Sequence, residues 1–275
     1  MRLTVALGIA GALLAGGAGP WVGAASRPLV AAHRGGALLW PENSLTAYRN
    51  ALALGVDYVE TDVHLTADGE VVVLHDPTLE RTTTGRGAVR EARRAALAGI
   101  RLKAGDGSAT DEPVPTLVQL LDLLGPARAG LLLEIKVDDR GQRYPGIEEK
   151  VLAMVRERGL GARTLVMAFE RDTVRRVREL DPTMRTVLLI GRGQVERERV
   201  WPAASVRWAV GLGAAAVGFN HRLIDPDVVA AAREARLTLA AWTVNEEADI
   251  RRVIGLGADI IISDRPDLAL RVAGR

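Results

Sequence analysis

The 275-residue chain contains no cysteine. This absence excludes disulfides, thiol nucleophiles and thiolate metal sites. Aromatic residues make up only 4% of the chain, and neither charge sign dominates, since 36 Lys and Arg stand against 34 Asp and Glu, a formal net charge of +2. The basic residues are scattered, which disfavours a nucleic-acid partner. Apolar residues are abundant at 48%, enough for a substantial core.

Residues 1–25 differ in composition from the rest of the chain. An apolar run over 3–18 follows Arg2 and leads to small residues that end near Ala25. This pattern is typical of a secretory signal peptide and predicts export to the periplasm or out of the cell. Because the next charge is Arg27, an uncleaved N-terminal membrane anchor is the alternative.

From residue 26 to 275 short apolar runs alternate with amphipathic stretches, which predicts one α/β domain. Near-continuous apolar runs are typical of parallel strands that are covered on both faces. Eight of them separated by helices predict a TIM (β/α)8 barrel. An open doubly wound sheet is the alternative, but no GxGxxG motif follows the first run. The stretch of about 71–113 does not fit the repeat and is predicted to be a small insertion after the second strand. The predicted strands are 28–32, 57–64, 131–136, 164–169, 186–190, 214–219, 237–242 and 259–263.

Carboxylates gather on two neighbouring predicted strands. The segment "VETDVHLTADGEVVVLHD", residues 59–76, reads as two strands joined by a turn, and it places Glu60, Asp62 and His64 on one face of the first. Glu134 lies near the end of the next strand. Such a set of oxygen ligands suits a hard divalent cation, Mg²⁺ or Ca²⁺, although any one carboxylate could instead pair with an arginine. His64 lies further along, toward the turn, and is expected at the surface.

Two histidines and two cations stand at the ends of the first and third predicted strands and of the arm that follows the second. His33 ends the first predicted strand, and His75 ends the arm that follows the second. Imidazoles at such positions suit general acid and base catalysis near neutral pH. Arg34 and Lys136 add positive charge, which favours an anionic substrate such as a phosphate.

The motifs together resemble those of the glycerophosphodiester phosphodiesterase family. The resemblance rests on "HRGG", on "PENSLTAYRNALALGVDYVETDVHLTADGEVVVLHDPTLERTTTG", on "LLLEIK", on "AWTVNE" and on "GADIIISDRPDLAL", and it spans residues 29–270. It implies a TIM barrel with a small insertion after the second strand. It also implies hydrolysis of glycerophosphodiesters to glycerol 3-phosphate and an alcohol, with one divalent cation, Ca²⁺ or Mg²⁺.

The resemblance also implies a role for each motif residue. One departure is Ala168-Phe169, where the family often has Ser-Phe; the hydroxyl that could contact the glycerol side is absent. The implied roles are acid and base catalysis for His33 and His75, phosphate contact for Arg34 with support from Lys136, metal binding for Glu60, Asp62 and Glu134, and substrate contact for Phe169 and Trp242.

Two other functions remain as alternatives. A lysophospholipase D acting on longer lipids would share the fold and the site, and it would make transient contact with a membrane. An exported binding module without catalysis should have lost at least one of the motif residues, and all of them are present. The implied partner is a small-molecule glycerophosphodiester; neither a nucleic acid nor a protein partner is implied.

Overall fold

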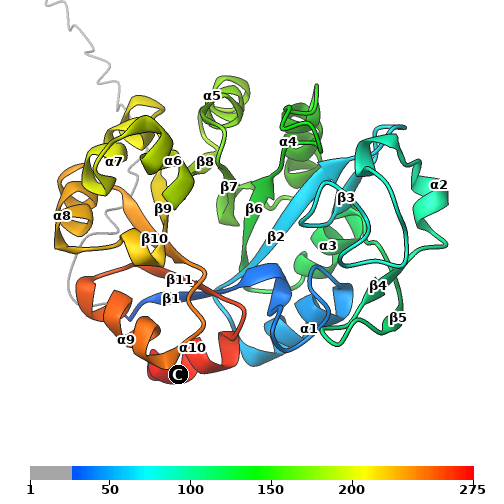
Figure 1. Cartoon of the computed structure of the whole chain (residues 1–275), viewed down its shortest axis with the longest axis horizontal. Helices are drawn as coiled ribbons and strands as arrows, with labels where there is room; N and C mark the ends of the chain where they lie inside the picture. The colour runs from blue at the N-terminus through cyan, green and yellow to red at the C-terminus, as the bar shows by residue number, and fades with distance from the viewer. Residues whose placement is uncertain (1–26) are drawn as a thin grey trace, which may run out of the picture.

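The computed structural model describes residues 27–275, so the predicted leader lies outside the described part and stays a prediction. Eight parallel strands form a closed barrel, which confirms the predicted fold class (Figure 1). The ring runs in the order β1-β11-β10-β9-β8-β7-β6-β2 and closes where β2 pairs with β1. Its strands are β1 (Leu29–Ala32), β2 (Tyr58–Leu65), β6 (Gly130–Ile135), β7 (Thr164–Ala168), β8 (Arg185–Ile190), β9 (Ala216–Asn220), β10 (Thr238–Trp242) and β11 (Ile260–Ser263).

Helices surround the ring of strands. Several begin where the sequence supplies a cap: Ser44 accepts from the Ala47 N–H, Thr116 forms a capping box with Gln119, and Asp225 accepts from the Val228 N–H. The helices are α1 (Leu45–Leu54), α3 (Leu117–Leu124), α4 (Ile147–Glu157), α5 (Arg171–Leu180), α6 (Arg192–Glu198), α7 (Pro202–Gly211), α8 (Pro226–Glu234), α9 (Glu247–Leu256) and α10 (Pro266–Val272). No helix among residues 27–275 is long and apolar enough to cross a membrane.

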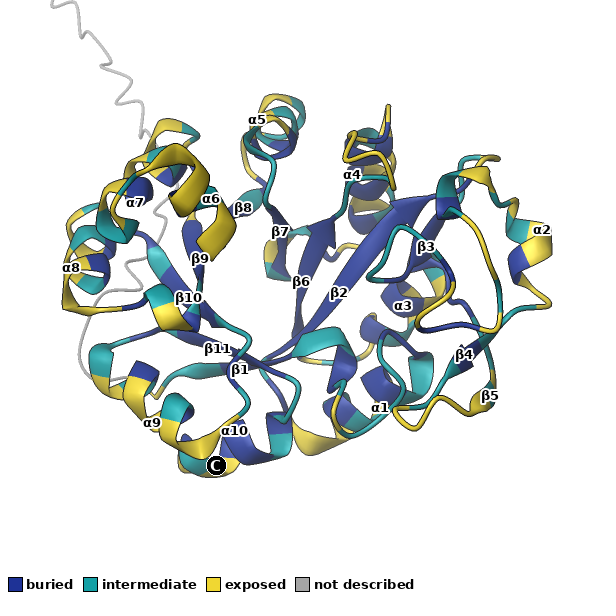
Figure 2. Ribbon diagram, in the orientation of Figure 1, coloured by how far each residue is buried: buried dark blue, intermediate teal, exposed yellow. Residues whose placement is uncertain are grey.

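The core has two main layers, because each strand buries both of its faces (Figure 2). One set of side chains, including Ala31, Leu132 and Val187, fills the inside of the barrel. A larger set packs the outside of the strands against the helices, whose far sides are exposed. This double burial explains why the strands read as apolar runs without polar alternation.

A separate segment lies between β2 and α3. It starts with β3 (Val71–Val73), which pairs antiparallel with β2, and ends with the hairpin of β4 (Arg101–Lys103) and β5 (Ala109–Pro113). Between β3 and β4 the chain forms a 3-10 turn (Val89–Glu91) and the four-residue α2 (Arg94–Leu97). The segment has a small apolar core of its own and lies to one side of the barrel in Figure 1.

Candidate active site

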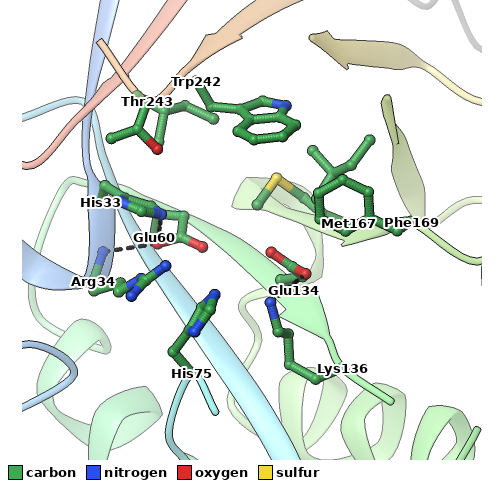
Figure 3. A pocket seen from close by; sticks show the side chains of 12 residues that line it. His33, Arg34, Glu60, His75, Glu134, Lys136, Met167, Phe169, Trp242 and Thr243 are labelled. Carbon is green, nitrogen blue, oxygen red and sulfur yellow. Dashed lines mark hydrogen bonds and ion pairs between the residues drawn. The ribbon is translucent and has the colours of Figure 1, made fainter. Parts of the chain in front are cut away.

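A pocket opens at the carboxyl ends of the barrel strands. Figure 3 shows its two sides: Arg34, His75, Glu134 and Lys136 lie across from Trp242, Met167 and Phe169. The polar side comes from β1, β2, β6 and the loops that follow them, as the sequence predicts. The lining residues are His33, Arg34, Glu60, His75, Glu134, Lys136, Met167, Phe169, Leu189, Trp242, Thr243 and Ile262.

The backbone turns sharply where β1 ends. Arg34 and Gly35 both have left-handed backbone angles, with φ of 52° and 81°. A Cβ atom at Gly35 would lie 2.7 Å from the Cβ of Ala47, so the chain can pass this close to α1 only with glycine there. The turn points the Arg34 backbone N–H at Glu60, whose Oε2 accepts it at 2.7 Å. The HRGG motif therefore orients both a histidine and a carboxylate.

The three predicted metal ligands form one buried cluster. Glu60, Asp62 and Glu134 are 1%, 0% and 7% exposed, and one oxygen of each lies within 4.8 Å of the others. The register of the sheet creates this cluster, because Asp62 pairs directly with Glu134 across β2 and β6. Asn43 donates its amide to Asp62 Oδ2 at 3.0 Å, whereas Glu60 Oε1 has no hydrogen-bond partner among the described residues.

The electrostatics of the cluster favour a cation. Burial and the neighbouring carboxylates Asp62 and Glu134 raise the pKa of Glu60 well above its usual value. Burial raises the pKa of Glu134 to about 7, even though the Lys136 ammonium lies 2.8 Å from its Oε1. Burial also opposes ionisation of Asp62, but the positive charges of Lys136 and its neighbours outweigh it and lower the pKa of that carboxyl. Three buried carboxylates repel one another when they are all ionised, and a hard divalent cation would offset that repulsion. The unpartnered oxygen of Glu60 also fits such a cation.

Each of the two pocket histidines is oriented by its own carboxylate. The Nδ1 of His33 lies 2.6 Å from Asp264 Oδ1, and the Nδ1 of His75 lies 2.6 Å from Asp76 Oδ1. An ionised carboxylate only accepts, so each Nδ1 carries the proton and each Nε2 is available as a base in the neutral ring. Burial lowers the pKa of His75 below its usual value, which favours the neutral ring. Both side chains are therefore prepared for proton transfer.

The opposite wall is apolar and aromatic. The rings of Phe169 and Trp242 meet edge to face, with centroids 5.4 Å apart and planes at 87°. Ala168 is fully buried and packs in the outer core, on the other face of β7. A hydroxyl at that position would follow the same direction, away from the pocket. The change from serine therefore removes no side chain from the pocket lining.

The prediction that His64 lies at the surface is wrong. Its side chain is fully buried, with Nε2 3.1 Å from the His75 carbonyl oxygen and Nδ1 3.0 Å from the Tyr144 hydroxyl. The β3 arm folds back over the end of β2, and the loop that carries Tyr144 covers the same place. The spacing of residues along one strand cannot predict that these two segments bury His64.

Several residues that orient the site were not predicted. Asp264 orients His33 and is itself held by Asn245, which donates to its Oδ2 at 2.7 Å. Asn43 directly precedes Ser44, the residue that caps α1, and donates its amide to Asp62. Asp76 is the neighbour of His75 in the sequence. A signal existed for both aspartates, because each directly follows a strand or arm that ends at the mouth.

The mouth of this TIM barrel combines buried carboxylates, two oriented imidazoles and two cations. Such an arrangement is typical of an enzyme that hydrolyses phosphate esters. The model of the glycerophosphoryl diester phosphodiesterase family matches residues 33–268, and the chain belongs to this family. It is a phosphoric diester hydrolase.

Similar proteins support the same family. The chain is 33% identical over 252 residues to a glycerophosphodiester phosphodiesterase of Caldanaerobacter subterraneus, covering 90% of this chain and 98% of the relative. The structure of a glycerophosphodiester phosphodiesterase from Agrobacterium tumefaciens aligns with a TM-score of 0.73 at 27% identity, covering 90% and 100% of the two chains. An Oleispira antarctica phosphodiesterase in complex with the product sn-glycerol-3-phosphate aligns with a TM-score of 0.76 at 26% identity, covering 90% and 97%.

Proposed function

We propose that this protein hydrolyses glycerophosphodiesters to glycerol 3-phosphate and an alcohol, using one divalent cation and two histidines. The observation that carries the proposal is the buried cluster of Glu60, Asp62 and Glu134 in the same pocket as His33 and His75. Membership of the family supports the reaction, and the carboxylate cluster supports the dependence on a divalent cation.

The carboxylate cluster suits Ca²⁺ or Mg²⁺ rather than a softer metal, because all three side chains offer oxygen. When bound, such a cation would neutralise phosphate charge and polarise a phosphoryl oxygen. Asn43 and the Arg34 backbone N–H fix Asp62 and Glu60, which would orient these ligands.

The chain's own residues can do the remaining work. The Arg34 and Lys136 side chains face the pocket and would bind the phosphate oxygens as negative charge builds on them. One imidazole, in its neutral form, accepts a proton at Nε2 from the attacking hydroxyl as the hydroxyl oxygen bonds to phosphorus. The other, starting as the imidazolium, donates its Nε2 proton to the oxygen of the departing alcohol as the bond from that oxygen to phosphorus breaks. The attacker is water or a hydroxyl of the substrate's own glycerol, and the second route passes through a cyclic phosphate.

The substrate body would lie against the apolar wall. Phe169 and Trp242 offer ring faces and edges to the carbon atoms of a small alcohol or of glycerol. The Oleispira phosphodiesterase, a structural neighbour, binds sn-glycerol-3-phosphate, which supports a product of this size.

Product release from glycerophosphocholine, glycerophosphoethanolamine, glycerophosphoinositol and lysophospholipids tests the proposal. We expect turnover of the first three, loss of turnover in EDTA, and recovery with Ca²⁺ or Mg²⁺. Full activity in EDTA, with no metal in the purified protein, would refute the role of the carboxylates. Turnover of lysophospholipids alone would refute the substrate class.

A matched pair of variants separates the cluster from general destabilisation. Glu134→Gln keeps the side-chain shape but removes one charge, and we expect it to weaken cation binding in calorimetry. Glu148→Gln is the control, because Glu148 is also buried, at 2% exposed, but is paired with Arg143 and does not line the pocket. Equal cation affinity in both variants would contradict the site.

A further inference from the structure

Arg81 joins two carboxylates at the edge of the active site. Its Nε donates to Asp76 Oδ2 at 2.6 Å, and its Nη2 donates to Asp76 Oδ1 at 2.8 Å. On its other side Nη1 and Nη2 donate to the two oxygens of Glu42, at 2.8 and 2.9 Å. One guanidinium thus holds two carboxylates, each through two hydrogen bonds, a geometry that an ammonium cannot reproduce.

Both carboxylates contact residues that the proposed function uses. Asp76 also accepts from Nδ1 of His75, and Glu42 also accepts from Nη1 of Arg34 at 3.0 Å. A continuous chain of charged hydrogen bonds therefore runs from His75 through Arg81 to Arg34. It connects a proton-transfer group to a phosphate-binding group.

The turn that carries Arg81 is itself held firmly. Thr83 is fully buried; its hydroxyl donates to the Leu79 carbonyl and accepts the Gly85 N–H at 3.0 Å. The Lys103 backbone N–H donates to the Thr82 carbonyl, which ties the turn to β4. The RTTTG motif thus builds a rigid support that presents its arginine to the mouth of the barrel.

We propose that Arg81 is a positioning residue, which orients His75 through Asp76 and Arg34 through Glu42. This inference rests on the proposed function of those two residues. Asp76 and Glu42 repel one another, and without the guanidinium between them each loses two of its hydrogen bonds. Asp76 is then free to turn away, and the His75 ring loses its fixed direction.

If Arg81 had a purely structural role, replacing it would lower the stability of the fold, and turnover would fall only as a result. Its side chain is 48% exposed, and exposed ion pairs contribute little to stability. Replacing it should therefore leave the fold nearly as stable as before. A large loss of turnover in a stable protein would point to positioning.

The test compares Arg81→Ala and Arg81→Lys with Arg251→Ala. Arg251 also makes two hydrogen bonds to a carboxylate, that of Glu247, but on the outer helix α9. We expect kcat to fall about 10- to 100-fold in both Arg81 variants, since small misplacements of catalytic groups have effects of this size. KM should rise less, because Arg34 keeps its contact with Asp62. The Arg251 variant should match the wild-type protein.

Chemical rescue adds a readout that stability cannot mimic. Millimolar guanidinium should restore part of the kcat of Arg81→Ala, whereas the same concentration of ammonium or sodium chloride should not. Wild-type kcat in Arg81→Ala would overturn the proposal, as would a loss of kcat that guanidinium leaves unchanged.

Nitrogen NMR of the imidazole rings tests whether Arg81 orients His75, and it does so independently of catalysis. The chain has four histidines, so the His75 ring can be assigned with a His75→Ala variant. We expect a single Nδ1–H tautomer of His75 in the wild-type protein and a mixture in Arg81→Ala. Unchanged His75 signals would overturn the positioning role. If the wild-type protein failed to hydrolyse any glycerophosphodiester, the proposed function would fall, and these spectra would still test Arg81.

Discussion

The Nε2 atom of His64 lies 3.1 Å from the carbonyl oxygen of His75. Burial lowers the pKa of His64 to about 4, so its ring is neutral at pH 7. A carbonyl only accepts, so Nε2 carries the proton, and Nδ1 accepts from the Tyr144 hydroxyl at 3.0 Å. One neutral imidazole thus ties the backbone of His75 to a residue on the loop before α4.

Replacing His64 should affect both stability and catalysis. We expect His64→Ala to lower the free energy of unfolding by about 2–4 kcal/mol, because it leaves a cavity and unpaired polar groups. Turnover should fall because the loop that carries His75 loses its anchor. Tyr144→Phe removes one hydroxyl and should cost about 1 kcal/mol. Urea unfolding and steady-state kinetics measure both; a His64→Ala protein with wild-type stability and kcat would contradict this role.

Removing either pocket histidine should abolish most of the activity without unfolding the protein. We expect His33→Ala and His75→Ala each to lower kcat by about 10²- to 10⁴-fold, the usual contribution of general acid–base catalysis. Cation binding, measured by calorimetry, should stay nearly intact. His221→Ala is the control, because His221 pairs with Asp249 and does not line the pocket. An equal loss in that variant would mean that the acid and base are wrongly assigned.

The cation-free protein should carry a pH signature of the carboxylate cluster. The folded-state pKa of Glu134 is raised to about 7, from the ordinary value of 4.5, so this group stabilises the fold fully below pH 4.5. Its contribution is lost as the pH rises through 7. Buried neutral histidines make the free energy of unfolding change with pH in the opposite direction. The contribution of Glu134 is therefore isolated by subtracting the free energy of unfolding of Glu134→Gln from that of the wild-type protein.

In EDTA, the unfolding free energy of the wild-type protein minus that of Glu134→Gln should decrease between pH 4.5 and 8. The expected decrease is on the order of 1–3 kcal/mol, since one pKa unit corresponds to about 1.4 kcal/mol. Saturating Ca²⁺ or Mg²⁺ should reverse the trend by binding the ionised cluster. Urea titrations at several pH values measure this difference. A value independent of pH would show that the Glu134 carboxyl is not perturbed.

The aromatic wall should govern substrate binding more than chemistry. Trp242→Ala removes the partner of Phe169 and a large contact surface, so we expect KM to rise about tenfold or more with a smaller change in kcat. Trp242→Phe should recover part of the binding. Initial rates over a range of glycerophosphocholine concentrations separate the two constants. An unchanged KM in Trp242→Ala would place the substrate elsewhere.

The repeating part of the fold could be predicted from sequence because its signals are local. Strands buried on both faces read as apolar runs, and caps such as Ser44 and Thr116 precede their helices. The charged helix α6 was not predicted, because its sequence RGQVERE has no apolar face of helical period. Helix formation there depends on neighbours that a single segment does not reveal.

The carboxylates and the two pocket histidines could be predicted because they stand at strand ends, where a barrel brings them together. The partners of Asp264 and Tyr144 could not be predicted, because their contacts connect distant parts of the chain. Asp264 meets His33 across 231 positions of sequence, and Tyr144 meets His64 across 80. Such contacts depend on the closure of the ring and on the loops above it.

The two walls of the pocket come from different stretches of the chain. His33, Glu60 and Glu134 lie on the first three strands of the ring or directly after them, whereas Phe169 and Trp242 lie beyond residue 164. A protein engineer could therefore vary Phe169 and Trp242 to accept new alcohols, provided that Asn245 and Asp264, which orient His33 from the same half of the chain, stay unchanged.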